Sequence, residues 1–199
     1  MATKLILASA SSRRHKLLAQ LGVDFSITAS NISEDVLVGE APRDYVERIA
    51  KSKANFVYRG MHSDQKRQTA VLGGDTSILL GDKIMGKPCD RLDALAMLAS
   101  LSGREHHVLS AVYIISSLGE NHRLSETRVR FRNLSKIECE AYWETGEPLD
   151  KAGSYGIQGL AAAFVESISG SYSGVVGLPL AETYDLLQWA NINTGLHIR

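Results

Sequence analysis

Apolar and polar positions alternate along the chain in a way that predicts strands and helices in succession. An apolar run at residues 4–8 fits a buried strand, and apolar residues at helical spacing follow over residues 13–21. Pro42 opens a second helix that carries Val46 and Ile49 on one face. Further strands are expected at residues 25–29, 70–80, 83–85, 107–116, 125–131, 163–168 and 175–176, and further helices at residues 91–101, 135–145 and 180–190. Without a strict βαβ rhythm, this order predicts one mixed α/β or α+β unit over residues 1–199.

Composition and charge narrow the range of partners. The chain has 199 residues, of which 44% are hydrophobic and 22% charged, and its formal net charge is zero. A balanced charge with no long run of one sign argues against duplex nucleic acid or an anionic membrane as the main partner. Cys89 and Cys139 follow no secretory signal, which favours reduced thiols and a cytoplasmic location. No apolar stretch is long enough to span a bilayer.

Small hydroxyl residues and two arginines stand where the first predicted helix begins. Arg13 and Arg14 occupy its first turn, where the helix dipole places partial positive charge and acidic residues are normally favoured. Two cations there lower stability unless an anion lies opposite them. Free backbone N–H groups, hydroxyls and guanidinium groups together make a phosphate site. An ordinary serine cap with two solvated arginines is the alternative.

Two acidic positions are candidates for metal binding or water activation. Asp75 ends an apolar strand behind Gly73 and Gly74, which let a ligand and the backbone approach closely. Glu34 stands in a polar segment and could complete a site for a hard divalent cation with Asp75, because magnesium on a triphosphate needs only one or two protein carboxylates. The alternatives are an aspartate that caps a turn and a solvated acidic loop.

Two lysines and a glycine-rich segment add candidates for phosphate and base recognition. Lys53 shares a helix face with apolar residues, which fits either a snorkelling lysine or a phosphate-binding lysine. Lys87 stands in a stiff loop after a short strand, a position that also suits phosphate. Residues 146–159 surround Tyr155 and Gln158 with glycines. This composition is typical of a binding loop whose backbone and amide groups could read a base edge.

Three common catalytic patterns are missing from the sequence. The histidines do not have metal-ligand spacing, and there is no Walker phosphate-binding loop. The segment Gly170–Gly174 has tyrosine where a nucleophile elbow needs serine.

Taken in order, the motifs identify a family. They are Leu-Ala-Ser-x-Ser-x-Arg-Arg, Gly-x-Asp-Thr, Gly-Lys-Pro, Leu-Ser-Gly, Gly-Glu-Pro-x-Asp-Lys-Ala-Gly-x-Tyr-Gly-Ile-Gln-Gly and Val-Gly-Leu-Pro. This set resembles the Maf family of nucleoside triphosphate pyrophosphatases, and within it the dTTP/UTP pyrophosphatase subgroup. The resemblance extends from Leu5 to about Leu187.

The resemblance implies a fold, a reaction and partners. The fold is the mixed α/β, Maf/ITPase-like arrangement of two lobes with a mixed sheet and a deep central cleft, within a single domain and commonly as a homodimer. Nucleoside triphosphates are hydrolysed to the monophosphate and pyrophosphate with a divalent metal, Mg²⁺ or Mn²⁺. Such activity serves house-cleaning of nucleotide pools, including modified pyrimidine nucleotides, and is linked to cell division arrest. The alternatives are a 7-methyl-GTP pyrophosphatase and a non-catalytic septum-formation inhibitor.

The resemblance also implies residue roles. Asp75 becomes the proton acceptor, and the specificity positions are Arg13, Thr76 and Gln158. The implied phosphate-binding residues are Ser9, Arg13, Arg14, Lys53 and Lys87, and the implied metal-binding residues are Glu34 and Asp75. The 7-methyl-GTP subgroup carries glutamate where this chain has Gln158.

The chain departs from the family pattern at a few positions, none of which removes a charged group. Ser12 stands where proline is usual before the arginines, and Ser77 replaces an apolar residue. Ser110 stands where threonine is usual, and alanines at 161–162 fill a place often rich in glycine.

Overall fold

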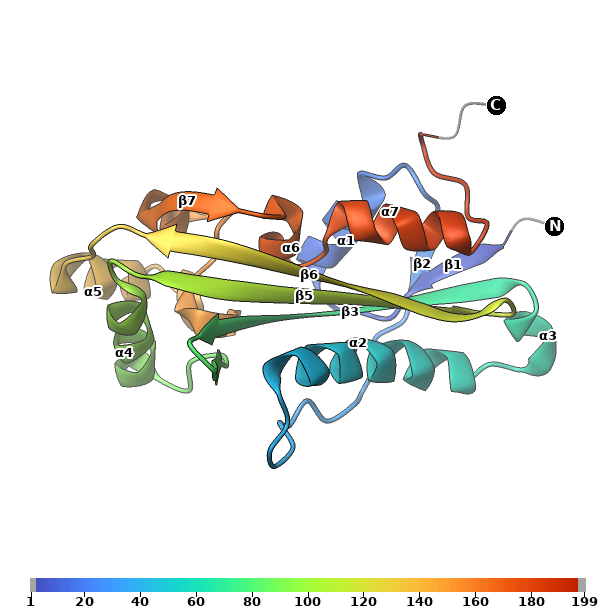
Figure 1. Ribbon diagram of the computed structural model, residues 1–199, viewed down its shortest axis with the longest axis horizontal. Coiled ribbons are helices and arrows are strands. Elements are labelled where there is room, and N and C mark those ends of the chain that lie inside the picture. Colours follow the sequence, from blue (N-terminus) through green and yellow to red (C-terminus); the bar gives the residue numbers. More distant parts are fainter. Residues whose placement is uncertain (1–2, 197–199) are drawn as a thin grey trace. The chain divides into compact units, whose positions relative to one another are not determined.

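The computed structural model describes residues 3–196, in which strands and helices follow one another along the chain (Figure 1). The strands are β1 (Lys4–Leu7), β2 (Phe25–Ile27), β3 (Thr69–Leu80), β4 (Lys83–Met85), β5 (Glu105–Ser116), β6 (Gly119–Phe131) and β7 (Val165–Ser169). The helices are α1 (Ser12–Ala19), α2 (Pro42–Arg59), α3 (Ser63–Lys66), α4 (Arg91–Leu101), α5 (Lys136–Glu144), α6 (Tyr172–Val176) and α7 (Leu180–Trp189). Three 3₁₀ helices are η1 (Glu147–Asp150), η2 (Ala152–Ser154) and η3 (Leu160–Phe164).

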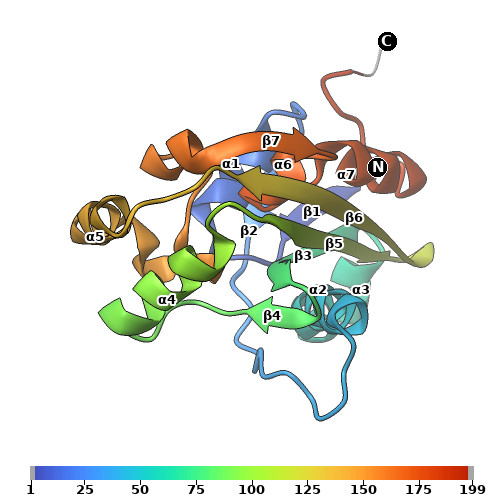
Figure 2. The same cartoon turned by 60° about the vertical axis from the view of Figure 1, so that its left-hand side comes forward.

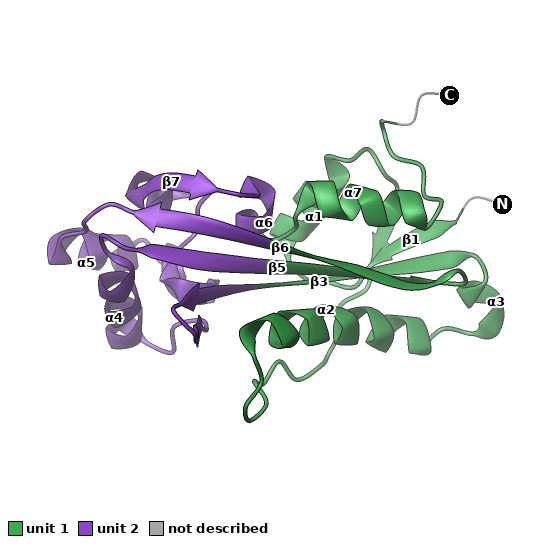
Figure 3. Cartoon of the chain, viewed as in Figure 1, with its two compact units in different colours: residues 1–76, 110–125, 177–199 green, residues 77–109, 126–176 purple. Residues whose placement is uncertain are grey.

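The strands form one mixed sheet, which confirms the predicted α/β class. Their order is β2-β1-β3-β5-β6-β7, and β4 pairs with β3 outside this path. The chain divides into two compact units, and β3, β5 and β6 each contribute residues to both (Figure 3). Unit 1 comprises the residues up to 76, residues 110–125 and the residues from 177 onward; unit 2 comprises residues 77–109 and 126–176.

Unit 1 is built on three parallel strands. In β1, Leu5 pairs with Phe25 of β2 on one side and with Ala70 of β3 on the other. Parallel strands need crossover connections. Helix α1 supplies the one between the neighbours β1 and β2, and α2 with α3 connects β2 to β3 on the other side of β1. Helix α2 lies on one face of these strands, and α1 and α7 lie on the other (Figure 1).

Helix α2 is amphipathic and packs unusually close to β3. Pro42 stands in its first turn, and its buried face includes Val46, Ile49 and Lys53. At Gly73 in β3, a Cβ atom would lie 2.3 Å from the carbonyl oxygen of Ala50 in α2. Only glycine permits this approach, which brings α2 against β3 two residues before Asp75.

Unit 2 combines antiparallel pairings with an aromatic core. Strand β4 returns along β3, and β7 runs along β6 (Figure 2). The rings of His106, Phe131, Tyr142, Tyr155 and Phe164 meet edge to face, with centroids between 4.8 and 6.1 Å apart. Such pairs stabilise a core beyond the area that they bury.

One predicted strand is wrong. Residues 175–176 belong to helix α6, because the Ser171 side chain accepts a hydrogen bond from the Gly174 amide at 3.0 Å. The Ser171 carbonyl accepts a second bond from the Val175 amide at 3.1 Å, which closes the first turn. Two neighbouring valines favour a strand, but this local serine cap decides the conformation.

Two further expectations agree with the structure. Cys89 and Cys139 both carry free thiols. Within residues 3–196, no helix has the length and apolar character needed to cross a membrane.

Candidate active site

Lys53 joins the two predicted carboxylates in unit 1. Its Nζ atom lies 2.8 Å from Oδ1 of Asp75 and 2.8 Å from Oε1 of Glu34. The side chains of Lys53 and Asp75 are each 8% exposed, whereas that of Glu34 is 50% exposed. A buried ammonium group needs such partners. Lys53 therefore does not snorkel to solvent but holds α2, β3 and the segment after β2 together through charge.

The position of Asp75 corrects the prediction that it ends a strand. Strand β3 continues to Leu80, because its last residues pair with β4, for example Ile78 with Met85. Asp75 thus lies within β3 and is 6% exposed. The close approach at Gly73 explains how a lysine from α2 reaches this carboxylate.

The two carboxylates around Lys53 could hold a divalent metal only if other groups complete its coordination. Two carboxylates converge on one positive group, and carboxylate oxygens are ligands that Mg²⁺ prefers. Among residues 3–196, no group of three or more histidine, cysteine or acidic side chains could hold a metal ion. One or two carboxylates suffice for Mg²⁺ when phosphates supply further oxygens.

The start of α1 has the cap that its sequence predicts. Ser11 is the N-cap, and its Oγ atom accepts a hydrogen bond from the Arg14 amide at 3.4 Å. Ser9 is buried and its Oγ atom accepts one from the Ser11 amide at 3.1 Å. The first turn carries Arg13, which is half-buried, and no acidic residue.

Arg14 is half-buried and belongs to a polar network. Its Nε atom donates to the Gly177 carbonyl at 2.8 Å, and its Nη2 atom to Oγ1 of Thr76 at 3.5 Å. Thr76 also donates to the Gly177 carbonyl at 3.3 Å and lies 2.9 Å from the hydroxyl of Ser110. Burial lowers the pKa of Arg14, against the attraction of Asp75. Ser110, which stands where threonine is usual in the family that the sequence resembles, thus still supplies a hydroxyl to Thr76.

Tyr45 is a site residue that sequence reasoning missed. Its hydroxyl donates to the backbone carbonyl of Glu34 at 2.9 Å. Burial raises the pKa of Tyr45 to about 12, and the charges of Asp75 and Glu34 add to this rise, so the hydroxyl remains a donor. Its spacing in the sequence could have indicated this role. Tyr45 stands eight positions before Lys53 and therefore on the same face of α2.

Lys87 and Gln158 belong to unit 2, and both side chains are exposed. The glycine-rich segment that carries Gln158 is more regular than predicted, because it contains η1 and η2. Glu147 braces it by accepting hydrogen bonds from the Tyr142 hydroxyl at 2.8 Å and the Leu160 amide at 2.9 Å. Tyr155 is a core residue, since it is 4% exposed and its hydroxyl lies 2.8 Å from Nε2 of His106.

Comparison with known proteins finds relatives that this chain matches over most of their length. It is 50% identical over 185 residues to a protein of Hahella chejuensis, covering 93% of this chain and 91% of that one. It is 48% identical over 196 residues to a protein of Colwellia psychrerythraea, with 98% and 92% covered, and 51% identical over 189 residues to one of Alcanivorax borkumensis, with 94% and 96% covered. Each of these relatives is named dTTP/UTP pyrophosphatase. Residues 4–190 match the family model described as Maf-like protein, and the chain therefore belongs to the Maf family.

Proposed function

We propose that this protein is a nucleoside triphosphate pyrophosphatase that acts on dTTP and UTP. The observation that carries the proposal is the contact of Lys53 with both Asp75 and Glu34, in a chain about half identical to relatives named dTTP/UTP pyrophosphatase. A non-catalytic regulator of cell division would not need two carboxylates gathered around a buried lysine.

The divalent metal, Mg²⁺ or Mn²⁺, is part of the proposal. Glu34 and Asp75 would hold it, because their carboxylates already converge on one cationic group. When bound, it supplies Lewis-acid neutralisation of the triphosphate charge.

The protein's own residues carry the remaining steps. Asp75 accepts the proton of a water molecule whose oxygen forms a bond to the α-phosphorus, while the bond from that phosphorus to the bridging oxygen breaks. Pyrophosphate leaves with the bridging oxygen, and the nucleoside monophosphate keeps the oxygen from water. Arg13, Lys53 and Lys87 bind the phosphates, and Ser9 with the start of α1 offers further polar groups. Arg14 holds Thr76 in place through the network described above.

Base selectivity is assigned to Gln158, together with Arg13 and Thr76. A neutral amide offers a donor and an acceptor, which match a carbonyl and the N3–H of thymine or uracil. A carboxylate at this position would suit the cationic base of 7-methyl-GTP instead. We therefore expect dTTP and UTP to be preferred, with CTP or 5-substituted uridine triphosphates tolerated.

A substrate panel tests the proposal. The purified protein is incubated with canonical, 5-substituted and N7-methylated triphosphates in Mg²⁺ or Mn²⁺, and pyrophosphate and orthophosphate are measured separately. Monophosphate and pyrophosphate from dTTP and UTP are the expected products. Nucleoside diphosphate and orthophosphate as primary products would exclude this reaction, and an equal or higher kcat/KM on 7-methyl-GTP would assign the protein to the other subgroup.

A homodimer and a cytoplasmic location complete the proposal. The homodimer rests on the resemblance to the family, and the cytoplasmic location rests on the two free thiols, which favour a reducing compartment. Light scattering on the purified protein measures the first directly, and a single-chain mass would reject it.

A further inference from the structure

The loop that carries Glu34 is closed by a sharp turn. In this 34–40 loop, the amide of Glu40 donates to the Leu37 carbonyl at 3.1 Å. Gly39 has a φ of 76°, which this turn requires at its third position and which glycine adopts without strain. The turn places Val38 in full solvent contact, so the apolar core does not hold the loop.

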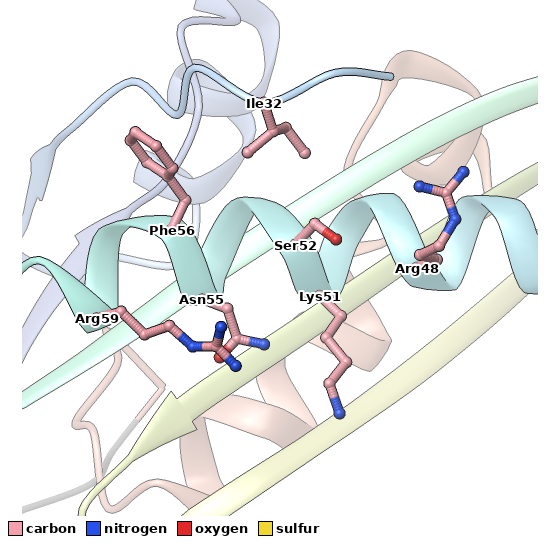
Figure 4. Close-up of a pocket in the computed structure, with 7 residues that line it drawn as sticks. All are labelled: Ile32, Arg48, Lys51, Ser52, Asn55, Phe56 and Arg59. Atoms are coloured by element: carbon pink, nitrogen blue, oxygen red, sulfur yellow. The ribbon is translucent and has the colours of Figure 1, made fainter. Parts of the chain in front are cut away.

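A charged clasp attaches the loop to α2. Both oxygens of Glu40 pair with the guanidinium of Arg48, and the Nη2–Oε2 distance is 2.8 Å. The same Nη2 atom donates to the backbone carbonyl of Asp35 at 2.9 Å. Oε2 of Glu40 also accepts the Leu37 amide at 3.1 Å. One guanidinium and one carboxylate thus fix both arms of the loop. Figure 4 shows Arg48 on α2, near the segment that carries Ile32.

The clasp differs from an ordinary surface ion pair. The Glu40 side chain is only 8% exposed, and a carboxylate so enclosed requires its partners. Its contact with Arg48 is bidentate, which fixes direction as well as distance. By contrast, Lys51 on the same helix makes a single contact with Glu120 at 2.8 Å, and these two side chains are 48% and 50% exposed.

Glu34 is the residue that this arrangement fixes. Tyr45 holds its carbonyl, Arg48 holds the next carbonyl, and Lys53 holds its carboxylate. We infer that Glu40 and Arg48 are positioning residues, which keep the 34–40 loop on α2 and thereby keep the half-exposed Glu34 carboxylate beside Lys53 and Asp75. The inference rests on the proposed function insofar as Glu34 holds the metal.

The experiment compares Glu40→Gln, Arg48→Gln and the double variant with the wild-type protein. Lys51→Gln is the matched control, because it removes a lysine pair from the same helix but leaves the loop untouched. Backbone hydrogen exchange reports on residues 33–40, and electron paramagnetic resonance measures Mn²⁺ binding to the protein without nucleotide.

In Glu40→Gln and Arg48→Gln, the backbone amides of residues 33–40 should exchange faster than in the wild type, and those of other residues should not. The midpoint of thermal unfolding should change little. Their dissociation constant for Mn²⁺ should rise about tenfold, as for other groups that orient a ligand from outside the coordination sphere. The double variant should show the same exchange rates and the same Mn²⁺ affinity as the single variants, because both substitutions break the same contact. Lys51→Gln should match the wild type.

The two readouts separate this inference from the proposed function. Wild-type exchange over residues 33–40 in Arg48→Gln would overturn the clasp, whatever the substrate proves to be. Faster exchange with unchanged Mn²⁺ affinity would overturn its positioning role. A wild-type protein that releases pyrophosphate but binds no Mn²⁺ without nucleotide would overturn the metal role of Glu34 and leave the reaction in place.

Discussion

The two units bury polar groups in different ways. Unit 1 buries charge, because Lys53 and Asp75 form an ion pair in which each side chain is 8% exposed. Unit 2 buries a neutral group, since His106 is fully buried and faces Tyr155 within an aromatic cluster. Burial lowers the pKa of His106 to about 4, and the neighbouring His107 adds to this shift, so the imidazole is uncharged at neutral pH.

The difference shows which buried polar groups indicate chemistry. Burying a charge is unfavourable even when it is paired, and apolar residues of similar volume often stabilise a fold better. A buried lysine between two carboxylates therefore suggests a selected function, whereas a neutral histidine with one hydrogen bond is accounted for by packing. The predictions below test this distinction.

The largest expected effect is the loss of turnover in Asp75→Asn. The amide keeps the shape of the side chain but cannot accept the proton, and removal of a general base typically lowers the rate by about 10²–10⁴-fold. Pyrophosphate release at saturating metal measures this loss, with circular dichroism as the control for folding. Near-normal turnover would mean that Asp75 is not the general base, and Glu34 would be the next candidate.

Lys53→Met should destabilise unit 1 because it leaves Asp75 buried without its cation. Removal of one partner of a buried ion pair lowers the free energy of unfolding by several kcal/mol. Because Glu34 is half-exposed, we expect a loss near the low end of this range, at about 3 kcal/mol. Denaturant unfolding measures the change. In the exposed Lys51–Glu120 pair, the equivalent change Lys51→Met should cost less than about 1 kcal/mol.

Adding Mg²⁺ to Lys53→Met tests whether the two carboxylates form a cation site. Because Mg²⁺ would replace the missing positive charge between the carboxylates, it should restore part of the stability of Lys53→Met and have a smaller effect on the wild type. Equal stabilisation of both proteins would mean that the carboxylates do not form a cation site.

In unit 2, the double variant His106→Phe/Tyr155→Phe should remove a pH-dependent component of stability without affecting turnover. The folded pKa of His106 is about 4 against 6.5 in the unfolded chain, so its contribution is complete above pH 6.5 and is lost as the pH falls towards 4. The shift corresponds to about 3 kcal/mol. Unfolding free energies of both proteins between pH 7 and 4 measure it. Parallel pH curves, or a large loss of turnover, would contradict the packing role.

The fold could be predicted wherever local signals were strong. Helix α5 is marked by a capping box of Ser135 and Glu138, and α2 by Pro42 and its helical apolar spacing. Helix α6 could not be predicted, because two valines in a five-residue segment favour a strand and the Ser171 cap decides against it. Glu147 was missed because its partners are fixed only by tertiary structure. A single domain over residues 1–199 stays a prediction.

The residue types of the candidate site could be predicted, but not their contacts. Glu34 and Asp75 were expected to cooperate, yet only the structure shows Lys53 between them. The Glu40–Arg48 clasp joins a loop to a helix over eight positions, which no helix-local spacing rule covers. The structure also gives the Arg14 guanidinium partners in Thr76 and Gly177 that the sequence did not indicate, and its role in phosphate binding stays a prediction.

Gln158→Glu tests the base preference assigned to an exposed residue of unit 2. The carboxylate loses the donor that pairs with a pyrimidine carbonyl, so kcat/KM for dTTP and UTP should fall about tenfold, which is the usual order for one hydrogen bond. Activity on 7-methyl-GTP should rise modestly. Steady-state rates on the three nucleotides measure both changes, and an unaltered ratio would remove Gln158 from base recognition.

The smallest expected effect is on stability, where substitutions of the neighbouring Arg13 and Arg14 should act in different directions. Arg13→Ala should leave the stability of the nucleotide-free protein unchanged or raise it by roughly 0.3–1 kcal/mol, because a cation at a helix N-terminus opposes the helix dipole. The same variant should bind triphosphate more weakly. Arg14→Ala should instead lower stability, because it removes hydrogen bonds to Gly177 and Thr76. Thermal unfolding of both variants, with and without a triphosphate, measures the contrast. If Arg13→Ala unfolds clearly below the wild type without nucleotide, then Arg13 stabilises the fold and its placement in the first turn of α1 does not indicate an anion site.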